Sequence, residues 1–209
     1  MTLTGPILAV GAHPDDVELG CAATLAAHPG STIITATLGG ARGTIDTRRT
    51  EATAAAADLG ASWACLGFDD LAVPAGHELS RAVELLAFQA LPAVVLTHWP
   101  DDTHPDHRAV ALAVAAACRP GAVTPHGLQL AYFEGISSRR FTPDWYVTTT
   151  TADLATATIA LGRYRSQLDG PVDIGGYLAR AAWRGSQVRT PAADAYAIGR
   201  LITTSHGTP

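Results

Sequence analysis

Two short turns in this sequence carry histidine and aspartate side chains that could act together on one ligand. The first reads Ala12-His-Pro-Asp-Asp16, and the second reads Asp101-Asp-Thr-His-Pro-Asp-His107. Either turn alone could be no more than the start of a helix, because Asp and Thr are common N-caps and Pro is favoured at the first helical position. Together, however, the turns offer three imidazoles and several carboxylates, which is the chemistry of a metal site.

Alternating strands and helices are expected around both turns. Apolar or β-branched runs of strand length lie at 6–12, 31–38, 61–68, 93–98, 129–133 and 145–149. Segments of helical composition lie at 16–27, 47–59, 78–89, 105–118, 152–167 and 177–184. This alternation predicts a Rossmann-like three-layer α/β/α sandwich with a mainly parallel sheet, formed by a single domain of residues 1–209.

Such a fold would bring the two turns to one place. Ligands of open α/β sheets bind outside the carboxyl ends of the strands, where the strand order reverses, and in the common order 3-2-1-4 the first and fourth strands are neighbours. Catalytic zinc takes three nitrogen or oxygen ligands from the protein and keeps one position open for water. His13, Asp16 and His107 can supply that set. Asp15 and His104 would then lie beside the metal, for proton transfer and charge stabilisation.

Composition limits the partners and the setting. The chain has 209 residues and a net charge of −5, which gives no electrostatic reason to expect nucleic acid. No apolar run is long enough to span a bilayer, and the first residues lack the basic region of a secretory signal. The cysteines, at positions 21, 65 and 118, are far apart and form no metal-binding pair. We therefore expect a cytoplasmic protein without a membrane partner.

Several segments resemble the PIG-L/LmbE family of de-N-acetylases. The resemblance is strongest at residues 12–20, Ala-His-Pro-Asp-Asp-Val-Glu-Leu-Gly, and at residues 104–107, His-Pro-Asp-His. It extends more weakly to residues 48–51, 67–70, 143–147, 164–167 and 193–196. Members of this family act on N-acetylglucosaminyl-phosphatidylinositol, on mycothiol and bacillithiol precursors, and on antibiotic intermediates.

The resemblance implies roles for the side chains of both turns. His13, Asp16 and His107 would bind one zinc ion per chain, in a site that could accept other divalent metals. Asp15 would be the general base. His104, as a protonated donor, would stabilise the developing oxyanion.

Roles are implied for other side chains as well. Asp106 would orient a neighbouring imidazole, and Arg48 and Asp70 would contact substrate hydroxyls. Asp194 stands where the family pattern has glutamate, so its role stays open. His98 is the last residue of the fourth expected strand and lies near the site. We interpret it as part of the strand end rather than as a metal ligand.

The favoured function is zinc-dependent removal of an N-acetyl group from an amino sugar or a sugar-bearing small molecule. The same site could instead hydrolyse a non-sugar N-acylated natural-product intermediate. A nucleotide-dependent oxidoreductase or transferase is disfavoured, because no Gly-x-Gly-x-x-Gly follows the first strand. A binding module without catalysis is the third alternative, because a fold alone does not fix function.

Overall fold

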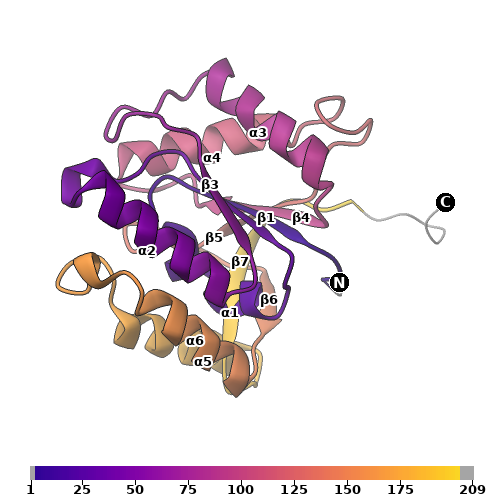
Figure 1. Ribbon diagram of the computed structural model, residues 1–209. Coiled ribbons are helices and arrows are strands. Elements are labelled where there is room, and N and C mark those ends of the chain that lie inside the picture. The colour runs from indigo at the N-terminus through magenta and orange to yellow at the C-terminus, as the bar shows by residue number, and fades with distance from the viewer. Residues whose placement is uncertain (1–2, 203–209) are drawn as a thin grey trace.

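The computed structural model describes residues 3–202, which form a seven-stranded sheet covered by helices on both faces (Figure 1). The strand order is β3-β2-β1-β4-β5-β7-β6, and the strands are β1 (Ile7–Gly11), β2 (Thr32–Thr35), β3 (Ser62–Cys65), β4 (Val94–His98), β5 (Leu130–Phe133), β6 (Trp145–Thr148) and β7 (Ala193–Arg200). The first five strands are parallel, whereas β7 runs antiparallel to both β5 and β6. The expected mainly parallel α/β fold is confirmed.

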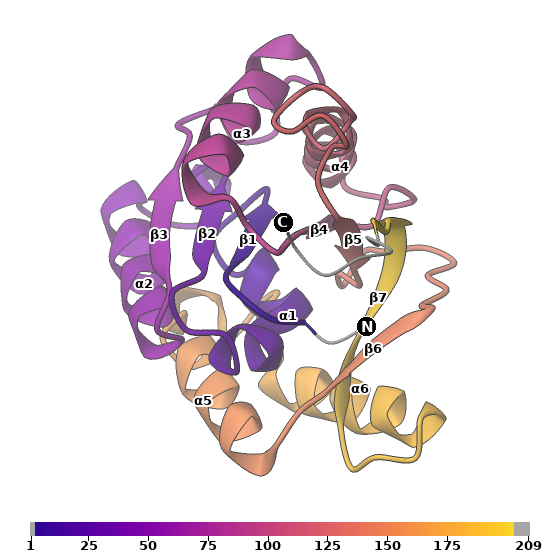
Figure 2. The same cartoon turned by 90° about the vertical axis from the view of Figure 1, so that its right-hand side faces the viewer.

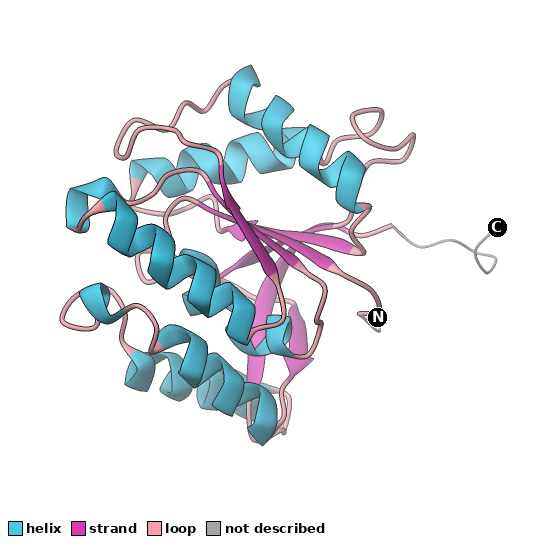
Figure 3. Ribbon diagram, in the orientation of Figure 1, coloured by secondary structure: helices cyan, strands magenta, loops and turns pink. Residues whose placement is uncertain are grey.

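The helices divide into two layers (Figure 3). They are α1 (Asp16–Ala26), α2 (Ile45–Asp58), α3 (His77–Ala90), α4 (Pro105–Ala117), α5 (Thr151–Leu161) and α6 (Ile174–Gln187), with short 3-10 helices at η1 (Gly40–Arg42) and η2 (Arg165–Gln167). Helices α3 and α4 pack their buried side chains in one core, and α1, α2, α5 and α6 pack theirs in the other. Since β1 and β4 lie between the two cores, all five residues of each are buried, which explains their continuous apolar runs.

The C-terminal part differs most from the expectation. Strand β7 was not predicted, and the helix expected over 152–167 ends at Leu161, near Gly162. Helix α6 begins three residues earlier than expected, because the Asp173 side chain accepts a hydrogen bond from Gly176 N–H (2.9 Å) and caps a first turn that contains two glycines of low helix propensity. In Figure 2, α6 lies beside β6 and β7.

The strand order places the two predicted turns side by side. Strands β1 and β4 are parallel neighbours, with Val10 opposite Thr97 near their carboxyl ends. The chain runs outward from β1 to β3 on one side and from β4 to β5 on the other, so the order reverses between them. None of the helices within residues 3–202 has the length and apolarity needed to cross a membrane.

Candidate metal and catalytic site

A cavity of about 220 Å³ gathers seven of the eight predicted site residues. These are His13, Asp15, Asp16, Arg48, Asp70, His104 and His107. The eighth, Asp106, is buried next to the cavity and contacts His13. The remaining lining residues come from the loops after β2, β3 and β5 and from the segment around η2: Gly39, Ala41, Arg42, Leu71, Ile136, Ser137, Gln167 and Pro171.

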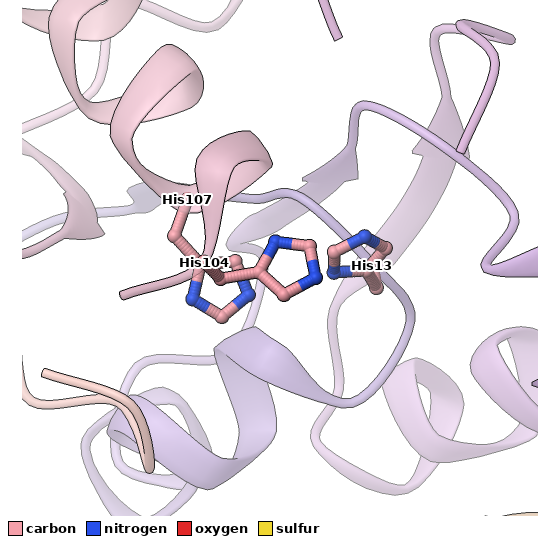
Figure 4. Close-up of side chains that lie close together, drawn as sticks. All are labelled: His13, His104 and His107. Carbon is pink, nitrogen blue, oxygen red and sulfur yellow. The ribbon is translucent and has the colours of Figure 1, made fainter. Parts of the chain in front are cut away.

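The Asp16 carboxylate lies between two imidazoles. Its Oδ2 is 3.2 Å from His13 Nδ1, and its Oδ1 is 3.4 Å from His107 Nε2. Figure 4 shows His104 extending from the start of α4 toward His13, with the ring of His107 on the other side of His104. Three groups of side chains within residues 3–202 place their potential ligand atoms within 4.8 Å of one another: His13, His104 and His107; Asp16, His98 and His107; and His13, Asp70 and Asp106. The predicted trio of His13, Asp16 and His107 is not itself one of these groups: His13 belongs to the first, Asp16 to the second, and His107 to both.

His98 lies in this cluster, but its hydrogen bonds leave it little to offer a metal. Its Nε2 accepts the backbone N–H of Ala12 at 3.0 Å, so the lone pair of that nitrogen is already engaged. Its Nδ1 is buried and has no partner among the described residues. Burial, followed by the charge of His107, lowers the pKa of His98 to about 4, and the ring stacks on His107 with centroids 4.0 Å apart. His98 thus packs and orients its neighbours as a neutral imidazole.

The second nitrogen of His13 faces two carboxylates. His13 Nε2 is 3.0 Å from Asp70 Oδ1 and 3.3 Å from Asp106 Oδ2. Asp106 also accepts the backbone N–H groups of Leu71 (2.8 Å) and Val73 (3.2 Å). A proton on Nε2 can therefore be donated to Asp70 or Asp106. These contacts orient the ring so that Nδ1 faces Asp16. This is the arrangement in which carboxylates orient a metal-binding histidine.

His107 is supported in the same manner. Its Nδ1 lies 3.3 Å from Asp102 Oδ1 and 3.2 Å from Ser137 Oγ, so Nε2 is left facing Asp16. Although burial raises it, the hydrogen bonds from His107 and Ser137 hold the pKa of Asp102 well below its usual range. Asp102 also accepts the backbone N–H of His104 at 2.8 Å and so fixes the second turn.

Asp15 has an unusual backbone conformation and a cationic neighbour. Its φ is +98°, a left-handed angle that few non-glycine residues adopt and that clusters at functional sites. Arg48 Nη2 donates to Asp15 Oδ2 (3.1 Å) and to the Pro14 carbonyl (2.6 Å). Burial raises the pKa of Asp15 to about 8, with Asp16 adding to the shift and Arg48 opposing it. Asp15 thus lines the cavity as a carboxyl poised for proton transfer.

Charge couples the imidazoles to Asp16. Although burial lowers it, the hydrogen bond and charge of Asp16 raise the pKa of His13 to about 9. For His107 burial has the same effect, and the charge of Asp16 with the hydrogen bond of Asp102 raises its pKa to about 10. His104 differs, because burial and the charges of His107 and His13 lower its pKa. Its Nδ1 accepts the Asp106 N–H at 3.2 Å, so a neutral ring carries its proton on Nε2.

The sequence did not predict that His98 stacks on His107 or that Ser137 contacts the same ring. His98 is the last residue of β4, so its place at the carboxyl end of a central strand was the available signal. Asp102 belongs to the second of the two turns, but its contact with His107 was not predicted. Ser137 lies in the loop after β5, and nothing in its local sequence marks it as a neighbour of a histidine thirty residues earlier.

The fold, with a His/Asp cavity at the point where the strand order reverses, defines an α/β protein of the kind that binds small ligands at this edge. The family model described as GlcNAc-PI de-N-acetylase (PIG-L) matches residues 8–118. The chain belongs to this family of deacetylases.

Individual relatives agree with this assignment. The chain is 36% identical over 126 residues to the uncharacterized deacetylase YaiS of Escherichia coli K12, a match that covers 54% of this chain and 68% of YaiS. Among solved structures, the conserved protein TT1542 of Thermus thermophilus is 26% identical, with a TM-score of 0.83 and 99% and 100% of the two chains covered. The N,N'-diacetylchitobiose deacetylase of Pyrococcus horikoshii is 20% identical, with a TM-score of 0.75 and 92% and 83% covered.

The same fold also occurs with another reaction. GalB, the 4-carboxy-2-hydroxymuconate hydratase of Pseudomonas putida KT2440, has a TM-score of 0.76 at 19% identity, with 98% and 100% of the two chains covered. Overall shape therefore does not select the reaction, and the function of this chain has to be argued from its site.

Proposed function

We propose that this protein is a zinc-dependent deacetylase that hydrolyses the N-acetyl amide of an amino sugar or a sugar-bearing small molecule. The observation that carries this proposal is the Asp16 carboxylate held between two imidazoles, with the separate buried carboxyl of Asp15 beside it. Residues 1–209 are proposed to act as one domain, because both halves of the chain contribute strands to one sheet and side chains to one cavity.

The donor set fits a divalent metal. Two ligand atoms at about 2.1 Å from a tetrahedral zinc ion lie roughly 3.4 Å from each other. Each imidazole has that spacing to one oxygen of Asp16: His13 Nδ1 is 3.2 Å from Oδ2, and His107 Nε2 is 3.4 Å from Oδ1. We assign these three side chains as the ligands, with Asp70, Asp106 and Asp102 orienting the imidazoles. A bound zinc ion would supply a Lewis acid and a water molecule acidic enough to ionise near neutral pH.

Asp15 is assigned as the general base. Its carboxylate takes a proton from the attacking water as the new C–O bond forms at the amide carbon, and it returns that proton to the nitrogen as the C–N bond breaks. The products are acetate and the free amine. Arg48 holds this carboxylate in place at 3.1 Å. Burial raises the pKa of Asp15 to about 8, and the charge of Arg48 opposes that shift, as a bound metal cation would, so that the carboxylate form is available as a base.

His104 is assigned as the donor to the developing oxyanion, with a changed protonation state. The sequence suggested a protonated imidazole, but burial and the neighbouring imidazoles lower the pKa of His104. A metal cation would lower it further. The neutral ring can still donate from Nε2, because its Nδ1 accepts the Asp106 N–H.

Arg48 and Asp70 contact other protein groups, in addition to the substrate contacts that the sequence suggested. Both oxygens of Asp70 are engaged, Oδ1 with His13 and Oδ2 with the Ala41 N–H at 2.8 Å, so we assign Asp70 to the support of His13. The Nε and Nη1 groups of Arg48 are buried without partners in the described structure. Arg48 lines the cavity, and we keep its guanidinium as the proposed donor to a substrate oxygen.

The cavity favours a compact substrate. Its volume of about 220 Å³ lies below the range of roughly 300–1,000 Å³ that is usual for drug-sized ligands. One feature favours the alternative of a non-sugar amide, however: Leu71 and Ile136, which are 62% and 63% exposed, both line the cavity. An apolar group attached near the amide would contact these two side chains.

Acetate release provides the test. The zinc-loaded protein would be offered N-acetylated amino sugars, their glycosides with polar or apolar aglycones, and N-acetyl amino acids. We expect turnover of sugar amides that is lost after metal removal and restored by zinc. Activity that survives strong chelators would refute the metal site, and turnover of N-acetyl amino acids alone would refute the sugar assignment.

A further inference from the structure

Helix α1, which begins with the proposed ligand Asp16, is broken inside. Cys21 has φ −157° and ψ 26°, which are not helical angles. The break divides α1 into a short first segment, Asp16–Gly20, and a second segment that ends at Ala26. In an unbroken helix each N–H donates to the carbonyl four residues earlier, so a break leaves backbone groups that need other partners.

Side chains from the C-terminal part of the fold supply partners for the second segment. The Ala23 N–H, which would otherwise donate to Leu19, donates to the Tyr177 hydroxyl at 2.9 Å. The Thr24 N–H donates to Asp194 Oδ2 at 2.8 Å. Asp194 therefore acts as an N-cap supplied by a distant strand, and a carboxylate is the preferred group at the positive end of a helix.

The end of the first segment is satisfied as well. The Leu19 carbonyl accepts a hydrogen bond from the Arg180 guanidinium. The Val17 carbonyl accepts from the Cys21 thiol at 3.2 Å. Each of these carbonyls would lie opposite an N–H of the next turn in a regular helix, so the break is capped on both sides.

Close packing coincides with the break. A Cβ atom on Gly20 would collide with the Phe133 ring on β5, and that ring packs against His98 at a centroid distance of 4.9 Å. The first segment thus lies directly against the residues that surround the proposed site. Its Glu18 is also fixed from the C-terminal half, because Glu18 Oε1 accepts the Tyr164 hydroxyl at 2.7 Å.

We propose that Asp194, Tyr177 and Arg180 are positioning residues that fix Asp16 by capping the break in α1. All three lie in α6 or β7, beyond residues 8–118 that the family model matches. The inference rests on the proposed metal site, because it concerns how one of its ligands is held. It also explains why the Asp194 carboxylate is buried, although the burial of a carboxylate costs free energy.

The hydrogen bonds of Asp194 support a capping role. Its Oδ2 accepts both the N–H and the hydroxyl of Thr24, each at 2.8 Å, and its Oδ1 accepts from Tyr177 at 3.3 Å. Tyr196 donates to the Thr24 hydroxyl at 2.6 Å. Asp194 has no ion pair with Lys, Arg or His within residues 3–202. The partners of Asp194 are therefore one helix N–H and two hydroxyls rather than a cation.

The test compares Asp194→Ala with the conservative Asp194→Asn and with a variant that removes a cap from another helix, α5. Asp153→Ala is the matched control, since Asp153 completes the exposed capping box at the start of α5. Cobalt(II) affinity, followed by visible absorption, reports on the ligands. Amide hydrogen exchange of the peptide over 15–20, measured in metal-free full-length protein, reports on the first segment.

We expect Asp194→Ala to weaken cobalt binding about 10-fold or more, as losses of residues that support metal ligands do, and to speed exchange over 15–20. Asp194→Asn should restore both, because its amide oxygen can still accept the Thr24 N–H. The control should lower the melting temperature but change neither readout. If Asp194→Ala is unstable, Tyr177→Phe removes only one hydroxyl and should give the same two changes to a smaller degree.

Unchanged exchange over 15–20 and unchanged cobalt affinity in folded Asp194→Ala or Tyr177→Phe protein would overturn the proposal. Equal effects from Asp153→Ala would overturn it too, because they would show a general loss of stability. Wild-type protein that binds no cobalt would refute the metal site instead, and the exchange measurement, which needs no metal, would still decide whether the caps hold the first segment.

Discussion

The tripeptide His-Pro-Asp occurs at the carboxyl ends of both β1 and β4, and its two copies serve the site differently. In the first copy, Asp15 has a left-handed backbone, no cap hydrogen bond from its side chain and a buried carboxyl beside Arg48. In the second, His104 is a regular N-cap, Pro105 opens the helix, and Asp106 accepts two N–H groups from the loop after β3.

This difference shows that the local sequence determines where a side chain lies in the fold but not which function it has. Each tripeptide is followed by a proposed ligand, Asp16 or His107. Asp15 contacts the Arg48 guanidinium and lines the cavity. Asp106 accepts backbone N–H groups and is buried next to the cavity. One is free for proton transfer, and the other is tied into the structure.

The largest effect should come from the ligands, and it separates two histidines of the same turn. His107→Ala should lose metal, with affinity reduced by more than about 100-fold, because it removes a ligand rather than a supporting group. His104→Ala should keep its metal and lose rate, because His104 is assigned to the oxyanion. Metal content and acetate release measure both. Full metal content in His107→Ala would show that this ligand is wrongly assigned.

The next effect concerns the two aspartates of the repeated tripeptide. Asp15→Asn should lower kcat by on the order of 100-fold or more while the metal stays bound, because it removes the general base. Asp106→Asn should have a smaller effect on kcat and should weaken metal binding, because Asp106 acts through His13. Equal losses of kcat in both variants, with metal retained, would contradict the separate roles.

The last prediction concerns the protons that metal binding displaces, and it links the two turns. In the metal-free protein the pKa of His13 is raised to about 9 and that of His107 to about 10, so both rings are protonated near neutral pH. A metal ligand must be deprotonated, so metal binding should release protons and become tighter as pH rises toward 9. Each proton released contributes about tenfold in affinity per pH unit.

Calorimetry in buffers of different ionisation enthalpy counts the protons released. We expect up to two at pH 7, and fewer as the pH rises through the raised pKa values of His13 and His107. Metal affinity that does not change between pH 6 and 8 would show that metal binding displaces no proton from either imidazole.

Much of the parallel half of the fold could be predicted from the sequence. Strand β1 and the first three residues of β4 are apolar, because helices cover both faces of these strands, and such runs are visible without any structure. Strand β7 could not be found in this way. It is held by antiparallel pairing with β5 and β6, which come from 45 or more residues earlier, and its Asp194 interrupts the apolar pattern.

The sequence by itself determined which side chains reach the carboxyl edge of the sheet. The turns after β1 and β4 contain His, Pro and Asp at helix starts, and parallel pairing of those strands brings their ends together. Only the tertiary structure decided how each group is charged and held. The partners of Asp15, Asp106 and Thr24 are Arg48, the N–H groups after β3, and Asp194, which lie 33 to 170 residues away in the chain. Burial makes these partners decisive, because a carboxyl removed from water takes its protonation state and orientation from the groups that surround it.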